Sequence, residues 1–160
     1  MYRINQILQN KMYNRYLLRI LGHEEKRSLC NHDLSHFLDV ARIAYIMTLE
    51  SGLDIAKEHI YAAALLHDIG RFSQYETGEP HEQASAHLCI EILSPCGFDD
   101  NEIFEIKEAI LNHRNNHIRN NNDFKGILFR ADKASRPCHH CHAESECNWD
   151  INKKNMTVNY

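Results

Sequence analysis

The sequence predicts a single all-α domain with a cysteine-rich C-terminal tail, and three observations support this. Apolar residues recur at helical spacing along most of the chain, and no segment has a convincing strand pattern. Glycine, proline and capping residues stand where the apolar periodicity begins or stops. The length of 160 residues suits one domain and is enough to bury a core.

The first half of the chain predicts three helices. A helix over 1–21 would end at Gly22 as its C-cap, and a second over 33–51 would stop at Gly52. Asp54 can cap a third helix, whose apolar side chains reach the core. The apolar stripe of the first helix consists of Ile4, Ile7, Leu8, Leu17, Leu18 and Leu21.

A loop is expected over 69–80, because this stretch holds two of the six glycines and one of the three prolines. A fourth helix is expected over 82–93, ending near Pro95. Asp99 followed by Glu102 resembles a capping box and predicts the start of a fifth helix.

The last expected helix covers 124–135 and is stopped by Pro137, after a polar, asparagine-rich loop over 115–123. We find no internal repeat and no second domain. The expected organisation is therefore a helical domain over 1–137 and a tail over 138–160 that packs on the same domain.

Composition narrows the expected environment. The net charge of -4 gives no general reason to expect a nucleic-acid polymer as partner. The N-terminal segment interleaves polar and apolar residues, unlike a signal peptide, and no apolar stretch is long enough to span a bilayer. We therefore expect a cytoplasmic protein without a membrane partner, whose six cysteines are thiols or metal ligands rather than disulfides.

The pair His67-Asp68 is the strongest functional signal in the chain. It ends an apolar helical run and is followed by Ile69 and the helix breaker Gly70. Burying a histidine beside an aspartate is costly unless each finds a partner. A divalent metal would satisfy both side chains at once. Further candidate ligands lie on either side of the pair, at His36, His81, His113 and Asp132.

These residues resemble the HD-domain superfamily of metal-dependent phosphohydrolases over residues 31–136. The superfamily pattern is a histidine, then His-Asp, then a distant aspartate, and subgroups that bind two metals insert two more histidines before that aspartate. In this chain Ser85 follows the first inserted histidine at a place where glycine is common. The matching residues, in chain order, are His36, His67, Asp68, His81, His113 and Asp132.

The resemblance implies an HD-type helical bundle that holds two divalent transition metals. His36, His67, Asp68 and Asp132 would hold one metal, and Asp68, His81 and His113 the other, with Asp68 as the bridging ligand. Mixed histidine and carboxylate ligation suits Fe, Mn, Co, Ni or Zn. The expected reaction is hydrolysis of a phosphate ester or anhydride, with a nucleotide as the expected small phosphorylated substrate.

Basic residues near the ligands are candidates for binding the substrate phosphate. Arg71 follows the His-Asp pair closely and can make a forked, charge-assisted contact. Lys133 and Arg114 directly follow a ligand and can serve the same role. The alternative for Arg71 is a salt bridge with Glu76 or Glu79.

Several alternatives stay open from sequence. His32 lies four residues before His36 on the same helical face, and it competes with His36 as ligand or else contacts substrate. His67 and Asp68 on their own could form a hydrogen-bonded pair at a helix end. HD-like folds with this ligand set also include di-iron oxygenases of small organic substrates. A third alternative is a module that binds a nucleotide without catalysis.

The tail carries a second candidate metal site. Cys138 and Cys141 are two residues apart, and Cys147 follows five residues later. Such thiolates chelate zinc or an iron–sulfur centre. Cys30 is the best distant candidate for a fourth ligand, with His142 or His140 second. We expect such a centre to be structural and separate from the His/Asp site; the alternative is free cysteines in a flexible tail.

Overall fold

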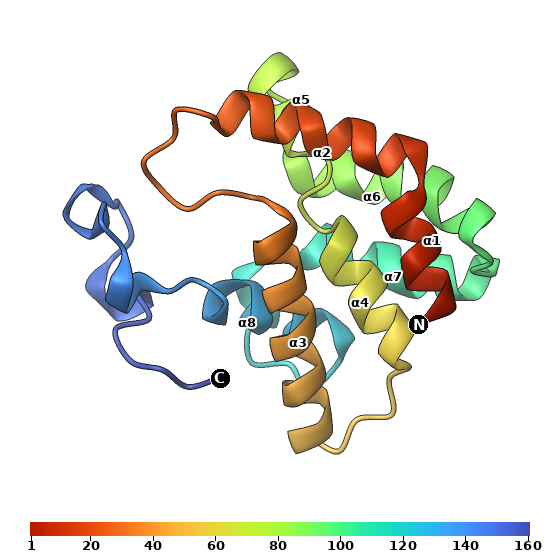
Figure 1. Cartoon of the computed structure of the whole chain (residues 1–160). Helices are drawn as coiled ribbons and strands as arrows, with labels where there is room; N and C mark the ends of the chain where they lie inside the picture. The colour runs from red at the N-terminus through yellow and green to blue at the C-terminus, as the bar shows by residue number, and fades with distance from the viewer.

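The computed structural model describes residues 1–160 and contains eight α-helices, short 3-10 turns and no strand (Figure 1). The predicted all-α fold class is therefore confirmed. None of the helices is long and apolar enough to cross a membrane. The helices are α1 (Tyr2–Gln9), α2 (Lys11–Glu24), α3 (Leu34–Glu50), α4 (Lys57–Leu66), α5 (Arg71–Thr77), α6 (His81–Leu93), α7 (Asp100–Asn112) and α8 (Phe124–Ala134).

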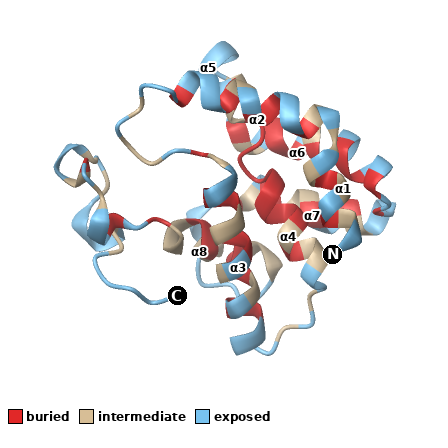
Figure 2. Cartoon of the chain, viewed as in Figure 1, coloured by how far each residue is buried: buried red, intermediate tan, exposed pale blue.

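Helix α4 lies at the centre of the bundle and packs against α1, α3, α6, α7 and α8. Every residue from Ala62 to Leu66, at its C-terminal end, is fully buried. A helix surrounded by neighbours needs apolar residues on every side, which explains this unbroken apolar run. Figure 2 shows the buried residues gathered on α4 and on the sides of the helices that face it. The central helix thus places His67 and Asp68, which follow its last turn, in the middle of the molecule.

The prediction of one helix over 1–21 is wrong, because the chain turns at Asn10. This residue has extended backbone angles, and its side chain accepts hydrogen bonds from the backbone N–H groups of Met12 and Tyr13. It thereby caps α2 and sets a new helix direction. Gly22 lies inside α2 instead of capping it, and Leu18 is exposed rather than part of a buried stripe.

The loop expected over 69–80 also contains a helix, α5. Phe72 anchors this helix by stacking on Tyr16 of α2, with ring centroids 5.1 Å apart. Gly70 and Gly78 stand at its two ends, and Gly78 adopts the left-handed conformation that often terminates helices. The glycines therefore mark the boundaries of a short helix, although their density suggested a loop.

Among the predicted starts of α3, α4 and α7 and the predicted end of α3, three boundaries match the structure and one does not. Asp33 caps α3 through a hydrogen bond from the N–H of His36, and Asp99 with Glu102 forms the predicted capping box of α7. Helix α3 ends just before Gly52, as expected. The prediction that Asp54 caps α4 is wrong, because α4 begins after Ala56 with no side-chain cap.

The tail runs from the end of α8 through three 3-10 turns, η3 (Cys138–His140), η4 (Glu144–Glu146) and η5 (Ile151–Lys153). It lies beside α8 and the segment between α2 and α3, on the side of the molecule opposite α1 (Figure 1). The side chain of Asn155 donates hydrogen bonds to the carbonyl oxygens of Lys133 and Arg136, at 2.6 and 2.9 Å. These bonds tie the tail to the end of α8.

Candidate metal centre

The six predicted ligands come from five helices and meet in the core of the bundle. His36 lies in the first turn of α3, His67 and Asp68 follow α4, and Asp132 lies in the last turns of α8. His81 begins α6, and His113 follows α7. All six side chains are buried. Helix ends and inner faces therefore supply the whole set, as in metal centres built inside helical bundles.

The first group contains His36, His67, Asp68 and Asp132, whose ligand atoms all lie within 4.8 Å of one another. Asp132 Oδ1 lies 3.5 Å from His36 Nε2 and 3.6 Å from His67 Nε2. Asp68 Oδ2 lies 3.4 Å from His67 Nε2 and 3.9 Å from His36 Nε2. These separations suit four ligands around a single ion.

The second group contains Asp68, His81 and His113, again within 4.8 Å of one another. Here the other carboxylate oxygen of Asp68, Oδ1, lies 3.0 Å from His81 Nε2 and 3.5 Å from His113 Nε2. The two histidine Nε2 atoms are 3.3 Å apart. Asp68 thus presents one oxygen to each group, which is the arrangement expected of a bridging carboxylate.

Hydrogen bonds to backbone carbonyl groups orient two of the histidine rings toward the centre of the site. The Nδ1–H of His67 donates to the carbonyl oxygen of Ala64 at 2.7 Å, and the Nδ1–H of His113 donates to that of Ile110 at 2.6 Å. The Nε2 atoms therefore point to the centre of the site. His67 Nε2 and Asp68 Oδ1 are buried without any hydrogen-bond partner. A divalent cation would satisfy both atoms, so the residues fit the metal.

The electrostatics of the site also favour a cation. Burial alone would raise the pKa of Asp68, but His67 and His32 hold this pKa well below its ordinary value. Burial, together with Arg136, lowers the pKa of His36 to about 2, so this imidazole is neutral. Although burial opposes it, the charges of Asp68 and Asp132 raise the pKa of His67 to about 9. A metal would displace that proton from His67.

An HD-domain family model matches residues 33–136, which contain all six of these residues. The chain belongs to the HD domain family. It is 46% identical over 158 residues to an uncharacterized protein of Clostridium beijerinckii, and the match covers 99% of each chain. It is also 35% identical over 74 residues to ribonuclease Y of a Sulfurovum species, over 46% of this chain and 14% of that protein.

A solved structure has the same fold. The crystal structure of a predicted HD superfamily hydrolase from an uncultured Thermotogales bacterium matches with a TM-score of 0.64 and 24% sequence identity. The match covers 91% of this chain and 80% of that one. Family membership and the buried His/Asp groups together support a metal-dependent hydrolase of the HD type.

His32 lies next to the two ligand groups of this HD domain but belongs to neither of them. Its Nδ1 lies 2.6 Å from Glu24 Oε1, and its backbone N–H donates to Glu24 Oε2 at 2.7 Å. Its Nε2 lies 3.7 Å from Asp68 Oδ2. Burial would raise the pKa of Glu24, but His32 lowers it to about 2, so Glu24 is ionised. The sequence held no signal for this buried carboxylate at the end of α2.

The predicted phosphate-binding residues occupy different positions around the HD-domain site. Arg71 pairs with neither Glu76 nor Glu79; its guanidinium lies 3.8 Å from Asp68 Oδ1 and 3.4 Å from His81 Nε2. Lys133 pairs with Asp132. Arg114 pairs with Glu82 at 3.1 Å, farther out on the surface. Arg136, which the sequence reasoning missed, lies 3.0 Å from His36 Nε2.

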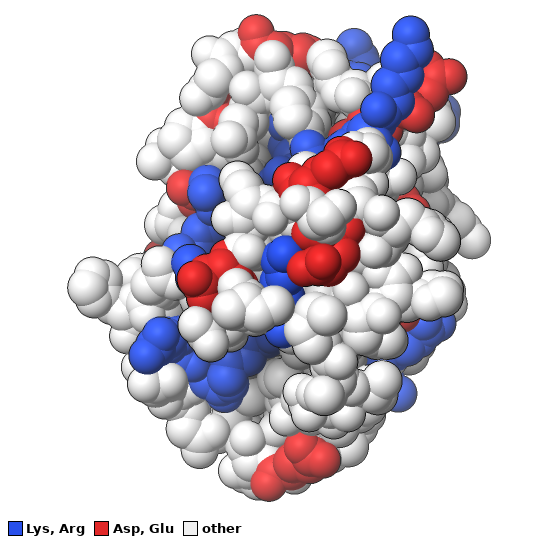
Figure 3. Space-filling model, turned by 90° about the vertical axis from the view of Figure 1, so that its left-hand side faces the viewer, with Lys and Arg blue, Asp and Glu red and all other residues white.

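The HD-domain site opens into a cavity of about 340 Å³. Its wall combines the His/Asp site with aromatic side chains and with the tail residues Cys138, Cys147, Asn148 and Trp149. On the face of the molecule that carries the tail, Lys and Arg side chains form patches among those of Asp and Glu (Figure 3). A chain of net charge -4 therefore has a basic cavity. The basic residues that line it are Arg27, Arg71, Arg114, Lys133 and Arg136.

The predicted cysteine site is only partly assembled. Cys30, Cys138 and Cys147 line the cavity of the His/Asp site, and Cys30 and Cys141 line an adjoining pocket of about 350 Å³. All six cysteines are free thiols. Both groups of three or more ligand atoms within 4.8 Å of one another belong to the His/Asp site, so no three of these sulfurs come that close.

Proposed function

We propose that this protein is a phosphohydrolase that uses two divalent metals to hydrolyse a phosphate ester or anhydride of a nucleotide. The observation that carries the proposal is the position of Asp68, with one oxygen toward each ligand group and one of these oxygens unpaired. Bound metals would supply Lewis acidity and lower the pKa of water, so that a nucleophile forms near neutral pH.

The cavity supplies the substrate contacts. Arg71 projects from α5 toward Asp68 and can bind phosphate oxygens with its planar fork, while Lys133 approaches from α8. The aromatic rings of Phe129 and Trp149 line the same cavity and offer faces on which a base can stack. The volume of about 340 Å³ suits a small ligand rather than a polymer.

His32 and Glu24 complete the proposed machinery. Glu24 fixes the His32 ring with its Nε2 toward the cavity, next to the carboxylate of Asp68. From there His32 can contact an oxygen of the bound substrate. This position supports the second of the two roles suggested by the sequence, substrate contact, whereas His36 joins the ligand group.

The charge around the cavity favours phosphate chemistry over the alternatives. Five basic side chains line a cavity that two aspartates and three histidines also line, and such a wall selects an anionic substrate. A small neutral organic substrate of an oxygenase would not need them. The similarity to a segment of ribonuclease Y, which by its name cleaves RNA, also supports attack on phosphate esters.

Metal analysis followed by a substrate screen tests the proposal. Protein purified without chelator is expected to contain divalent transition metal and to hydrolyse a nucleotide from a panel of phosphate monoesters, diesters and anhydrides. Asp68→Ala should lose most of the bound metal and all turnover while keeping its helical circular dichroism, because both groups lose their shared ligand. Asp39→Ala, which changes a partly exposed aspartate on α3 outside both ligand groups, is the matched control. Full activity in a folded, metal-free Asp68→Ala protein would end the proposal.

A further inference from the structure

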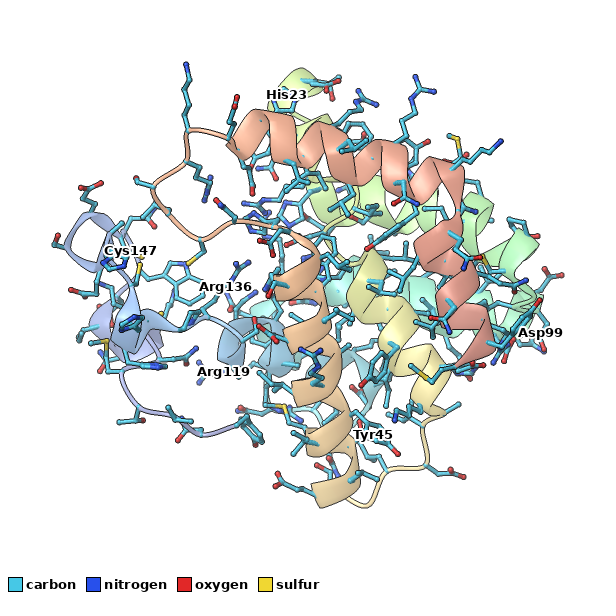
Figure 4. The ribbon with its side chains drawn as sticks, viewed as in Figure 1. His23, Tyr45, Asp99, Arg119, Arg136 and Cys147 are labelled. Atoms are coloured by element: carbon cyan, nitrogen blue, oxygen red, sulfur yellow. The ribbon has the colours of Figure 1, made fainter.

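Four cysteines from distant parts of the chain gather at one edge of the cavity. Cys30 precedes α3, whereas Cys138, Cys141 and Cys147 lie in the turns that follow α8. The two pockets that adjoin there are lined between them by all four. Figure 4 shows Cys147 on the part of the tail that faces the segment between α2 and α3, with Arg136 nearby. The fold therefore brings Cys30 to three cysteines that lie more than a hundred residues later in the chain.

The other two cysteines behave differently. Cys89 and Cys96 are buried among apolar core residues, and burial raises the pKa of Cys89 to about 12. Cys30 instead faces thiols: burial raises its pKa, and although Arg136 lowers it, the three tail cysteines raise it further. Thiolates that face one another repel unless a cation binds them.

Few contacts of its own stabilise the conformation of the tail. Between residues 138 and 160 only Cys138 and Ala143 are buried. Asn155 and the pairing of Lys154 with Glu144 are among its few side-chain anchors. A segment with so little apolar surface cannot offset the entropy of its own ordering. A ligand that cross-links the tail to Cys30 would provide this order.

The spacing of the sulfurs discriminates between the two kinds of thiolate centre. Four thiolates around one zinc lie about 3.8 Å apart, as follows from a Zn–S bond of about 2.3 Å in a tetrahedron. No three of these sulfurs lie within 4.8 Å of one another. In a [4Fe–4S] cluster each thiolate binds a different iron, so the four sulfurs form a wider frame. The sulfurs therefore do not form the close group that a single zinc requires, whereas a cluster does not require it.

We propose that Cys30, Cys138, Cys141 and Cys147 bind a [4Fe–4S] cluster that cross-links the tail to the segment preceding α3. Arg136 and Lys154 lie beside these cysteines and would offset the negative charge of the thiolate-bound cluster. The role is structural: Trp149 follows Cys147 by two residues, so the cluster fixes one wall of the substrate cavity. The site is separate from the His/Asp centre and does not depend on the proposed hydrolysis.

Acid-labile sulfide is the decisive measurement, because metals at the His/Asp site bring none. The full chain, purified anaerobically and reconstituted with equal amounts of ferrous and ferric iron and with sulfide, should contain about four sulfides per chain and show the broad visible absorption of thiolate-bound iron. Cys141→Ser should lose the sulfide, whereas Cys89→Ser and His81→Ala should keep it.

Two results would overturn this inference. One is a single zinc per chain with no sulfide in the anaerobically purified protein. The other is equal sulfide in the wild type and in Cys141→Ser, which would mean adventitious iron sulfide. If Cys141→Ser fails to fold, the count of freely reactive thiols in the native wild-type protein decides. Cys89 and Cys96 are buried in the core and do not react in either case. The absence of any reactive thiol therefore supports the cluster, and any reactive thiol excludes it.

Discussion

At the scale of single residues, the site depends on Asp68, because its two oxygens serve two different sets of ligands. Its position directly after His67 lets one short turn supply a ligand to both groups. Each group also has ligands of its own, so the two proposed metal positions can be tested separately by mutation. The second group has only histidines besides Asp68, namely His81 and His113.

His81→Ala and His113→Ala are each expected to lower the metal content by about one ion per chain. The first group keeps four ligands in both variants and should retain its metal. Metal analysis of chelator-free protein measures the change, and His87→Ala, an exposed histidine on the same helix as His81, is the matched control. Unchanged stoichiometry in both variants would mean that these histidines hold no metal.

The sequence could identify the six candidate ligands because their chemical types and order form a recognisable pattern. It could not identify Glu24 or Arg136. Glu24 ends α2 without any motif and contacts His32 only after the chain has turned back. Arg136 reaches His36 across a separation of 100 residues, which only the fold creates. Residues that orient a site through tertiary contacts leave no local pattern.

At the scale of helices, the mistaken boundaries have two causes: a local capping signal was overlooked in the first helix, and a tertiary partner creates α5. Asn10 breaks the first helix because its side chain caps the next. Helix α5 exists because Phe72 has an aromatic partner on α2. The helices with strong apolar periodicity and clear caps, such as α3 and α7, match the prediction because their signals are local.

Gly70 lies between α4 and α5, where its backbone packs closely against α6. Its N–H donates to Ser85 Oγ at 2.9 Å, and an added Cβ would lie 2.7 Å from the Ala84 side chain and even closer to the backbone of Ser85. Gly70→Ala should therefore cost about 1–3 kcal/mol of stability through overpacking. It should also lower metal content, because Asp68 lies two residues away. Denaturant unfolding measures the change.

Gly22→Ala is the control for this prediction, since a Cβ there would meet nothing within 4 Å. Gly22 lies inside α2, where alanine has the higher helix propensity, so this variant should be neutral or slightly stabilising. Equal stability of the two variants would show that the segment around Gly70 shifts freely, and the tight packing would then have no energetic consequence.

The docking of α1 is expected to depend on pH through Glu102. Burial would raise the pKa of Glu102, but Arg3 and His59 lower it to about 2 from an ordinary 4.5. A depressed carboxyl pKa stabilises the fold above the ordinary value, and this contribution disappears as pH falls toward 2. Glu102→Gln should cost about 1 kcal/mol at neutral pH and nearly nothing near pH 2. Denaturant unfolding at both pH values measures the difference, and an equal cost at both would exclude the ion pair as its source.

At the scale of the whole molecule, the tail completes the cavity that the helices leave open. The His/Asp site and most of the basic residues belong to the helical domain, whereas Cys147, Asn148 and Trp149 form a wall from the tail. The sequence predicted that the tail packs on the domain but could not predict that it faces the cavity of the His/Asp site. That position follows from the path of the chain after α8, which Asn155 fixes through the carbonyl oxygens of Lys133 and Arg136.

Trp149 makes this arrangement measurable, because it is the only tryptophan in the chain and it lines the cavity. A nucleotide whose base stacks on the indole should change its fluorescence, whereas inorganic phosphate, which reaches only the basic side chains, should change it little. Trp149→Ala should weaken nucleotide binding by about 1–3 kcal/mol, the value of one stacked base, and leave phosphate binding unchanged. Equal losses for both ligands would instead mean that the tail merely closes the cavity, without contacting the base.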